Sequence, residues 1–254
     1  MNANGFEKLH GIDEMDEKQV LTLCRTAEWL TRQKLSGTIE LYRPVKVQTG
    51  RTPRQTGARR IRRTNVMKRI GILGAGTWGM ALARMLTVSG NDVLVWSAIE
   101  KEIDSLSTTR KHPNLPQMKI PDELRFTKSI EEVCKDKDIL LFAVPSVFVR
   151  STAAKARPYV ADGQIIVDVA KGIEPDTLYT MTEILADELG KEGGPKGVRL
   201  VALSGPTHAE EVAIDLPTTI VSASKDMEAA AFVQEVFTNN VMRVYTNEDI
   251  KGVE

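Results

Sequence analysis

A glycine-rich stretch in the first third of the chain has the composition of a loop that could bind a phosphate group. Gly74, Gly76 and Gly79 occupy the glycine positions of the pattern GxGxxG, spelled GAGTWG here. In this pattern the first glycine permits a tight turn, the second lets the backbone approach a pyrophosphate, and the third lets a helix pack on the preceding strand. Because free amides at the positive end of a helix attract anions, the stretch predicts a site for a nicotinamide dinucleotide, NAD or NADP.

The residues about 20 positions further on leave the choice between NAD and NADP open. An acidic residue usually ends the second strand of such a unit and binds the adenosine ribose. Here the sequence reads WSAIE from Trp96 to Glu100, with neither an aspartate nor an arginine at the expected tip. Ser97 could serve either cofactor, and the sequence gives no reason to prefer one.

Two further segments carry groups that could meet a ligand at strand ends. Residues 144–146 (VPS) and 170–172 (AKG) each follow an apolar run, and open α/β sheets bind ligands at the carboxyl ends of their strands. The ammonium group of Lys171 could polarise a carbonyl group or hold a phosphate there. A solvated surface lysine explains the same position equally well at this point.

The stretch SGPTHAEEVA, residues 204–213, places a Gly-Pro turn between a strand and the start of a helix. We expect Thr207 to cap that helix and to face the cleft, where its hydroxyl group would suit a substrate phosphate or hydroxyl. Glu210 and Glu211 in the first turn would favour the helix dipole. His208 could be a general acid, but no evident carboxylate orients it, so we interpret it as a residue that lines the cleft.

These residues need a scaffold of alternating strands and helices to bring them together. From Met67 onward, runs rich in Val, Ile and Leu alternate with stretches of helical length, and several runs are apolar at nearly every position. Such runs are typical of parallel strands that helices cover on both faces. We therefore predict an α/β fold with a doubly wound, mostly parallel, Rossmann-like sheet. The predicted strands are 69–73, 92–96, 124–127, 139–144, 165–169, 200–203, 218–222 and 242–245, and the first helix should extend from the glycine loop to about residue 89.

The N-terminal extension, residues 1–66, differs in composition from the rest of the chain. Residues 14–35 carry apolar side chains at helical spacing, whereas 48–65 are rich in Gln, Gly, Thr, Pro and Arg and predict a disordered arm. Residues 51–69 hold eight basic and no acidic side chains, which leaves the remainder of this neutral chain at about −8. The arginines of the arm could contact nucleic acid, but no aromatic residues are interleaved. A solvated linker or an artefactual extension is therefore the preferred interpretation, and we do not expect a nucleic-acid partner.

Composition also argues against a membrane protein and against a metalloprotein. The longest apolar run, residues 139–144, is far shorter than the roughly 20 residues that span a bilayer, and the polar start has no signal-peptide pattern. Two cysteines, Cys24 and Cys134, are present with neither a CxxC spacing nor nearby histidines. We expect reduced thiols, no metal site and no membrane insertion, in a cytoplasmic protein.

Three groups of motifs occur together in order: GAGTWG, then VPS with AKG, then LSGPTHAEEVA. Over about residues 67–254 this combination resembles the bacterial type of NAD(P)-dependent glycerol-3-phosphate dehydrogenase, and the pair AKGIE and SGPTHAEEVA carries most of the resemblance. The resemblance implies reversible hydride transfer between NAD(P)H and dihydroxyacetone phosphate, giving sn-glycerol 3-phosphate for glycerophospholipid synthesis. The implied partner is this small phosphorylated substrate, and a homodimer stays open.

The family's site residues transfer to individual positions of this sequence. The resemblance implies dinucleotide contacts from Thr77, Trp78 and Ala209, contacts to both dinucleotide and substrate from Lys171, and substrate contacts from Gly205 and Thr207. The family often has a basic residue or histidine where Ala98 stands. This chain therefore departs from the family at that cofactor contact.

The resemblance divides the chain into three parts. The extension 1–66 has no counterpart in the family, 67–246 is the dinucleotide domain, and 247–254 begins a helical substrate domain. In the family an early lysine of that helical domain donates a proton to the carbonyl oxygen, and this lysine would lie beyond Glu254. We therefore expect a fragment that lacks the catalytic lysine and the remainder of the helical domain, binds dinucleotide and turns over poorly.

Two other functions stay open on the sequence alone. A reductase of the ketopantoate or hydroxyacid type would use the same dinucleotide domain, with other motifs in place of SGPTHAEEVA. The second alternative is a non-catalytic dinucleotide-binding module that senses redox state.

Overall fold

The apolar runs of the sequence form one eight-stranded sheet. The computed structural model describes residues 66–254, and its strands are β1 Arg69–Leu73, β2 Asp92–Trp96, β3 Arg125–Thr127, β4 Ile139–Phe142, β5 Ile165–Asp168, β6 Arg199–Ser204, β7 Thr218–Ala223 and β8 Met242–Asn247. Their order in the sheet is β3-β2-β1-β4-β5-β6-β7-β8. Every neighbouring pair is parallel except β6 with β7. The predicted α/β fold with a mostly parallel sheet is therefore confirmed.

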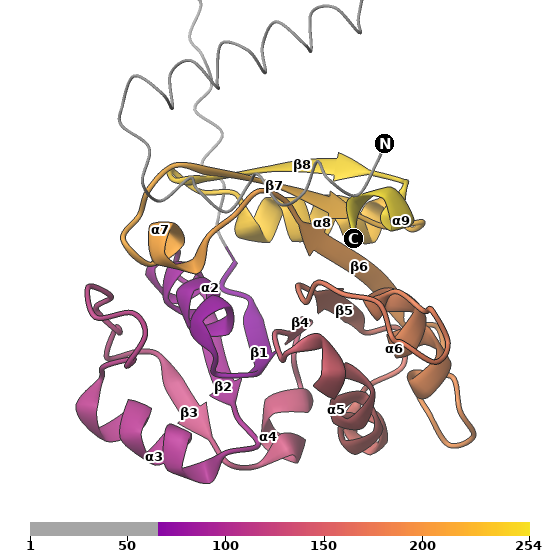
Figure 1. Cartoon of the computed structure of the whole chain (residues 1–254), viewed down its shortest axis with the longest axis horizontal. Coiled ribbons are helices and arrows are strands. Elements are labelled where there is room, and N and C mark those ends of the chain that lie inside the picture. The colour runs from indigo at the N-terminus through magenta and orange to yellow at the C-terminus, as the bar shows by residue number, and fades with distance from the viewer. Residues whose placement is uncertain (1–65) are drawn as a thin grey trace, which may run out of the picture. The chain divides into compact units, whose positions relative to one another are not determined.

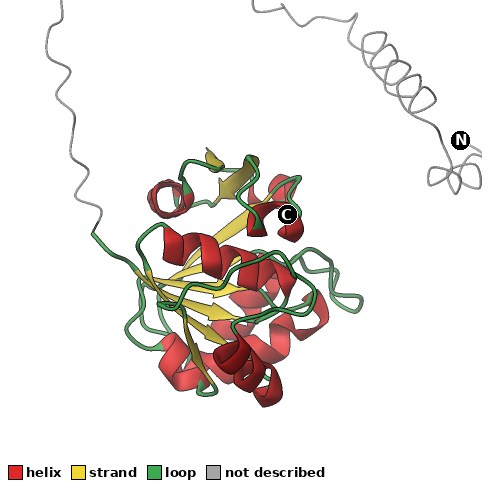
Figure 2. Cartoon of the chain, turned by 90° about the vertical axis from the view of Figure 1, so that its left-hand side faces the viewer, coloured by secondary structure: helices red, strands yellow, loops and turns green. Residues whose placement is uncertain are grey.

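Helices cover both faces of the sheet (Figures 1 and 2). They are α2 Thr77–Val88, α3 Glu100–Thr109, α4 Ile130–Cys134, α5 Val149–Ala156, α6 Met181–Leu189, α7 Ala209–Ala213, α8 Met227–Phe237 and α9 Ile250–Val253, with the 3₁₀ turns η4 Ser146–Phe148 and η5 Arg157–Tyr159. Successive strand side chains point to opposite faces. Ile139 and Leu141 join a buried cluster with α2 and α8, whereas Leu140 and Phe142 join a second cluster with α5 and α6. Two apolar clusters on opposite faces are the packing expected of a doubly wound sheet.

The strand order reverses between β1 and β4, which places a switch point at the carboxyl ends of these two strands. The loop after β1 crosses this point, since the amide of Gly74 donates to the carbonyl of Trp96 at 2.8 Å and the amide of Ala143 donates to that of Leu73 at 2.9 Å. Ligands of open α/β sheets bind in the crevice at such a point. The fold therefore positions the glycine loop where a ligand is expected.

The predicted bounds hold for β1 and β2 and shift by one or two residues in the other strands. The fourth strand ends at Phe142 rather than at residue 144, because the chain turns toward Pro145, which has no amide hydrogen for the ladder. The last strand continues to Asn247 rather than to residue 245, since β8 pairs with β7 along its whole length. The first helix ends at Val88, close to the predicted end.

Residues 247–254 pack on α6. The side-chain carboxylate of Glu254 accepts hydrogen bonds from the amide and the hydroxyl group of Thr182, at 2.7 and 2.6 Å. The ammonium group of Lys251 lies 2.5 Å from the carboxylate of Glu183. The domain bounds at 66/67 and 246/247 stay predictions, and the expected helix and arm of the N-terminal extension lie outside the described residues.

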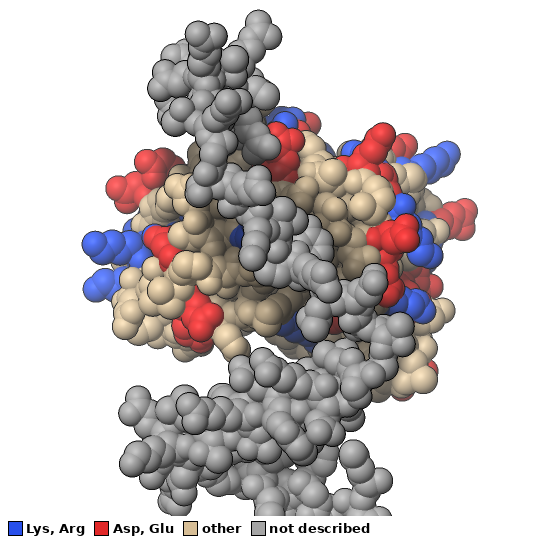
Figure 3. All heavy atoms as spheres, turned by 90° about the horizontal axis from the view of Figure 1, so that it is seen from above, with Lys and Arg blue, Asp and Glu red and all other residues tan. Residues whose placement is uncertain are grey.

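Within residues 66–254, no helix is both long and apolar enough to cross a membrane. Lys and Arg side chains are interspersed with Asp and Glu on the face shown in Figure 3. Cys134 is buried beneath α5, and burial raises the pKa of its thiol to about 12. The thiol is therefore protonated and poorly reactive at neutral pH, as expected of a structural cysteine, while Cys24 lies outside the described residues.

Candidate functional site

The first and third glycines of the loop occupy positions that exclude a side chain. Gly74 has φ of 122°, and a Cβ atom there would lie 2.5 Å from the carbonyl oxygen of Ala143, just after β4. A Cβ atom on Gly79 would lie 2.3 Å from the carbonyl oxygen of Gly74. Residues with side chains would have to move the backbone at either position. The loop therefore passes closely over the ends of β1 and β4.

Gly76, in contrast, faces open space. Its φ is −67°, and a Cβ atom there would meet no atom of residues 66–254 within 4 Å. It is the N-cap residue of the 12-residue helix α2, no side chain of residues 66–254 caps this end, and the first turn contains no acidic residue. Free amides at the positive end of a helix attract phosphate groups. The residues present therefore fit a pyrophosphate that approaches the backbone at Gly76.

A cleft of about 350 Å³ opens beside the start of α2. The cleft is lined by Thr77, Trp78, Val169, Lys171, Thr207, His208, Ala209 and Glu210. Five of these positions are ones that the sequence predicts to meet cofactor or substrate: Thr77, Trp78, Lys171, Thr207 and Ala209. The structure thus brings together residues that are more than a hundred positions apart in the chain.

Lys171 joins the loop after β5 to the turn after β6. Its ammonium nitrogen donates a hydrogen bond to the carbonyl oxygen of Gly205, at 2.9 Å. An ammonium group has three hydrogens, so two remain for a ligand in the cleft. Gly172, next in the chain, has φ of 154°, and a Cβ atom there would lie 2.8 Å from the Cβ atom of Ser146. This close approach brings the AKG and VPS segments into direct contact.

The expectation that Thr207 caps the following helix is wrong. The amide of Thr207 turns back to the carbonyl oxygen of Gly205, at 2.9 Å, so the helix begins later. His208 is the N-cap residue of α7, and its side chain forms no capping hydrogen bond. Thr207 still lines the cleft. Glu210 and Glu211 occupy the first helical turn, as predicted.

His208 is exposed and lines the cleft, which agrees with its interpretation as a lining residue. Among residues 66–254, no carboxylate forms a hydrogen bond or an ion pair with its ring. A general acid needs a group that orients the imidazole. The geometry therefore gives His208 no catalytic assignment.

The hydroxyl group of Ser97 is already engaged at the tip of β2. It donates to the carboxylate of Glu102 at 2.5 Å and accepts from the amide of Ile99 at 3.1 Å, and the residue is buried. Ser97 is therefore a poor candidate for a ribose contact. The carboxylate of Glu102 brings an acidic group to this tip, which the sequence did not indicate because Glu102 lies in the first turn of α3.

An ion-pair cluster braces the loop that carries Lys171. The guanidinium group of Arg150 on α5 donates two hydrogen bonds to the carboxylate of Glu174, at 2.8 and 2.7 Å, and also pairs with Asp187 on α6. The hydroxyl group of Thr177 donates a third hydrogen bond to Glu174, at 2.6 Å. The hydrogen bonds from Arg150 and Thr177 lower the pKa of Glu174 to about 2. Bidentate geometry of this kind restrains both partners, so the loop is held at both helices.

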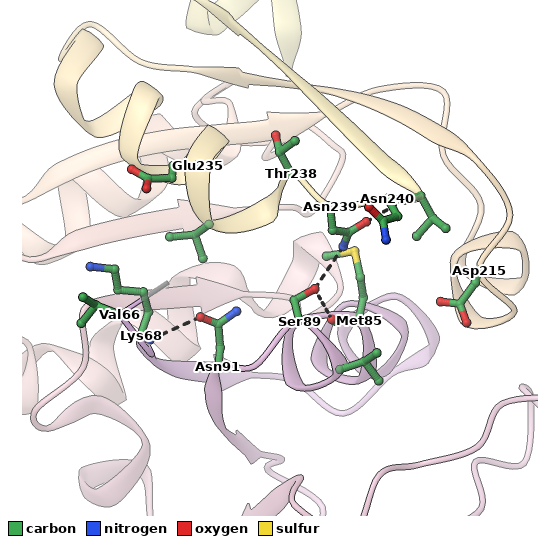
Figure 4. Close-up of a pocket in the computed structure, with 13 residues that line it drawn as sticks. Val66, Lys68, Met85, Ser89, Asn91, Asp215, Glu235, Thr238, Asn239 and Asn240 are labelled. Atoms are coloured by element: carbon green, nitrogen blue, oxygen red, sulfur yellow. Dashed lines mark hydrogen bonds between the residues drawn. The ribbon is translucent and has the colours of Figure 1, made fainter. Parts of the chain in front are cut away.

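A larger cavity of about 740 Å³ lies away from these residues (Figure 4). Its lining includes the carboxylates of Asp215 and Glu235 and the C-terminal ends of α2 and α8. The side-chain amide nitrogen Nδ2 of Asn239 donates to the hydroxyl group of Ser89 there, at 3.2 Å. Asp215 is paired with Arg84, and Lys68 also lines the cavity. The helices meet this cavity at their C-terminal ends, which carry negative partial charge, whereas the cleft beside α2 offers the positive N-terminal end that attracts phosphate groups.

His112 lies behind the glycine loop and was not predicted from the sequence. Its Nε2 atom is 3.3 Å from the carbonyl oxygen of Ala75. No local pattern marks this histidine, because its partner lies 37 residues earlier in the chain. Within residues 66–254, no group of three or more His, Cys, Asp or Glu side chains is arranged to hold a metal ion.

Comparison with known proteins identifies the family. Residues 69–230 match the family model described as the N-terminus of NAD-dependent glycerol-3-phosphate dehydrogenase. The chain is 67% identical over 188 residues to glycerol-3-phosphate dehydrogenase [NAD(P)+] 2 of Lactobacillus delbrueckii subsp. bulgaricus, covering 74% of this chain and 56% of that protein. It is 47% identical over 189 residues to glycerol-3-phosphate dehydrogenase [NAD(P)+] of Agathobacter rectalis, covering 74% and 54%.

A solved structure agrees with these sequence matches. The crystal structure of glycerol-3-phosphate dehydrogenase from Coxiella burnetii superposes with a TM-score of 0.65 at 30% identity, over 74% of this chain and 56% of that one. The chain thus spans about half the length of the relatives that it matches. The matched region contains the glycine loop, the loop of Lys171 and the turn of Thr207. By these matches, the chain belongs to the NAD-dependent glycerol-3-phosphate dehydrogenase family, in its N-terminal part.

Proposed function

We propose that this chain is the dinucleotide-binding part of an NAD(P)-dependent glycerol-3-phosphate dehydrogenase. The reaction is the reversible reduction of dihydroxyacetone phosphate by NAD(P)H and a proton, which yields sn-glycerol 3-phosphate and NAD(P)⁺. The observation that carries the proposal is the meeting of the start of α2, Lys171 and Thr207 in one cleft at the carboxyl edge of the sheet.

The proposed dinucleotide contacts begin at the N-terminal end of α2. Gly76 leaves room for the pyrophosphate, and Thr77 and Trp78 follow in the first helical turn, where they line the cleft. Ala209 lines the same cleft from α7. NAD(P)H supplies the hydride when it is bound. Ala98, which is exposed and uncharged, favours neither NAD nor NADP.

The proposed substrate contacts lie on the loops after β5 and β6. The positive charge of Lys171 suits either the carbonyl oxygen, which gains negative charge during hydride transfer, or the substrate phosphate. Its hydrogen bond to Gly205 holds the ammonium group at the turn that carries Thr207. The hydroxyl group of Thr207 can then donate to a substrate oxygen.

Turnover is proposed for a polypeptide of the relatives' length, because this chain spans about half of them. No described residue is assigned as the proton donor, and within residues 66–254 no carboxylate orients His208. The proposal for residues 66–254 is therefore binding and orientation. A cytoplasmic homodimer that feeds glycerophospholipid synthesis is the corresponding proposal for the whole protein.

The test measures binding and turnover separately. NADH and NADPH are titrated against this chain, and their oxidation with dihydroxyacetone phosphate is followed in a fusion of residues 66–254 to the C-terminal half of the Lactobacillus delbrueckii relative. We expect dinucleotide binding by both proteins and substrate-dependent oxidation by the fusion. Binding without oxidation in a folded fusion would instead indicate another substrate or a redox sensor.

A further inference from the structure

A buried histidine lies directly behind the glycine loop and takes no part in the proposed reaction. His112, between α3 and β3, is 3% exposed. Its Nε2 atom lies 3.3 Å from the carbonyl oxygen of Ala75, and its Nδ1 atom lies 3.2 Å from the amide nitrogen of Asn114. Because that amide donates, Nδ1 accepts, and a neutral imidazole then carries its hydrogen on Nε2. His112 therefore donates a hydrogen bond to the carbonyl of Ala75.

The segment that carries this imidazole is anchored by contacts of its own. Leu115, Met118 and Ile120 are buried in the same apolar cluster as α2. The guanidinium group of Arg110 donates to the carbonyl oxygen of Leu124 at 2.6 Å, which closes the segment on itself. A residue supported in this way can hold a neighbouring loop in one geometry. The core of the domain, rather than the glycine loop, thus sets the position of the imidazole.

The contact with Ala75 determines the direction of the next amide in the chain. Ala75 is 1% exposed, and within residues 66–254 no other group donates to its carbonyl oxygen. The peptide bond is planar and trans, so the carbonyl of Ala75 and the amide of Gly76 point in opposite directions. With the carbonyl directed inward to His112, the Gly76 amide is directed away from His112.

We infer that His112 is a positioning residue that orients the Gly76 amide toward the phosphate of the dinucleotide, an inference that rests on the proposed cofactor site. Without the imidazole the buried carbonyl of Ala75 loses its hydrogen-bond partner, which is costly. Rotation of the peptide plane between Ala75 and Gly76 could then bring this carbonyl to another hydrogen-bond donor, and the glycine permits the rotation. The Gly76 amide would no longer be oriented before the dinucleotide binds. Part of the binding free energy would then be spent on orienting it, so the affinity would fall.

Matched variants separate the hydrogen bond from the packing of the side chain. His112→Gln keeps an N–H donor near the position of Nε2, whereas His112→Met has a similar length and no donor. His112→Asn is a second variant without the bond, because its shorter amide does not reach Ala75, and it serves if the Met variant fails to fold. Ser222→Ala is the control, since it removes another buried side-chain hydrogen bond to a main-chain carbonyl, that of Ala230, at 3.0 Å.

The full chain is titrated with NADH by fluorescence, and the Gly76 amide is followed in ¹H–¹⁵N spectra without ligand. We expect the Met variant to weaken NADH binding about tenfold, the Gln variant to stay within about threefold, and the Gly76 signal to move in the Met variant but not in Ser222→Ala. Unchanged binding in the Met variant, or equal loss in the Gln and Met variants, would overturn the inference. A wild-type chain that binds neither NADH nor NADPH would contradict the proposed function instead, and the Gly76 signal would still test the role of His112.

Discussion

The ammonium nitrogen of Lys171 lies 2.9 Å from the carbonyl oxygen of Gly205, although 34 residues separate the two in the chain. Lys171 follows β5 and Gly205 follows β6, and these strands are parallel neighbours, so their carboxyl ends meet at one edge. The bond couples the two loops that carry the proposed substrate contacts. A change in either loop is therefore expected to affect both.

Replacement of Lys171 should impair the reaction far more than the fold. In the fusion protein, Lys171→Ala is expected to lower kcat/KM for dihydroxyacetone phosphate by at least about a hundredfold, because a preorganised positive charge beside the substrate is lost. The melting temperature should change little, since the side chain is exposed. Lys155→Ala removes another exposed lysine, on α5, and serves as the control. An unchanged kcat/KM would refute the assignment of Lys171.

Two glycine variants should separate binding from folding. Gly76→Ala adds a Cβ atom with no atom of the described part of the chain within 4 Å, at φ of −67°, so stability should stay within about 1 kcal/mol of wild type. The same methyl group occupies the space proposed for the pyrophosphate, so the Kd for NADH should rise at least about tenfold. Gly74→Ala places its Cβ atom 2.5 Å from the carbonyl oxygen of Ala143, and should destabilise the domain in urea unfolding. Equal NADH affinity of Gly76→Ala and wild type would rule out this placement of the phosphate.

The pair of Arg150 and Glu174 should make stability depend on pH in the acidic range. Hydrogen bonds from Arg150, and then from Thr177, lower the pKa of Glu174 from 4.5 to about 2. Because the folded pKa lies below the unfolded value, the carboxylate stabilises the fold above about pH 4.5 and this contribution is lost as the pH falls toward 2. Glu174→Gln should therefore have a lower melting temperature than wild type at neutral pH. This difference in melting temperature should shrink as the pH falls from about 4.5 to about 2.

Glu131→Gln is the control for this measurement, since it breaks an exposed pair between the first turn of α4 and its C-cap residue, Lys135. Exposed pairs of this kind contribute little, so its melting temperature should follow that of wild type. A difference between Glu174→Gln and wild type that stays constant down to pH 2 would contradict the pH dependence.

Asp168 should destabilise the fold at neutral pH. Its carboxyl group is 2% exposed, and Oδ1 has no hydrogen-bond partner within residues 66–254. Burial, with a further contribution from the charge of Glu254, raises its pKa well above 3.8. Since the folded state then holds its proton more tightly than the unfolded state, stability is lost as the pH rises above about 3.8.

Asp168→Asn removes this ionisation and keeps an oxygen for the amide of Ala170. We expect its melting temperature to exceed that of wild type at pH 7 to 8, with a gain that declines as the pH falls toward about 4. Asp176→Asn, at an exposed position, should show no such gain. A lower melting temperature of Asp168→Asn across the whole range would sink the prediction.

Local patterns in the sequence were sufficient to predict the sheet and the glycine loop. Apolar runs such as Ile139–Phe142 can be buried on both faces only in a central strand, and GAGTWG needs only its neighbours to form a turn before a helix. The motifs around Lys171 and Thr207 were sufficient to indicate the family, because each is a short contiguous stretch. Their joint position in one cleft also followed, since carboxyl ends of parallel strands share an edge.

Tertiary structure decided what depends on contacts between distant segments. Thr207 does not cap α7 because its amide turns back to Gly205, and the hydroxyl group of Ser97 is held by Glu102. The hydrogen bond from His112 to Ala75 joins residues 37 positions apart. It forms because the buried side chains of Leu115, Met118 and Ile120 fix the segment that places the imidazole behind the glycine loop. Hydrogen bonds of about 3 Å require positions accurate to a fraction of an ångström. Sequence periodicity determines which face a residue occupies, and only the packing of whole elements determines which atoms meet.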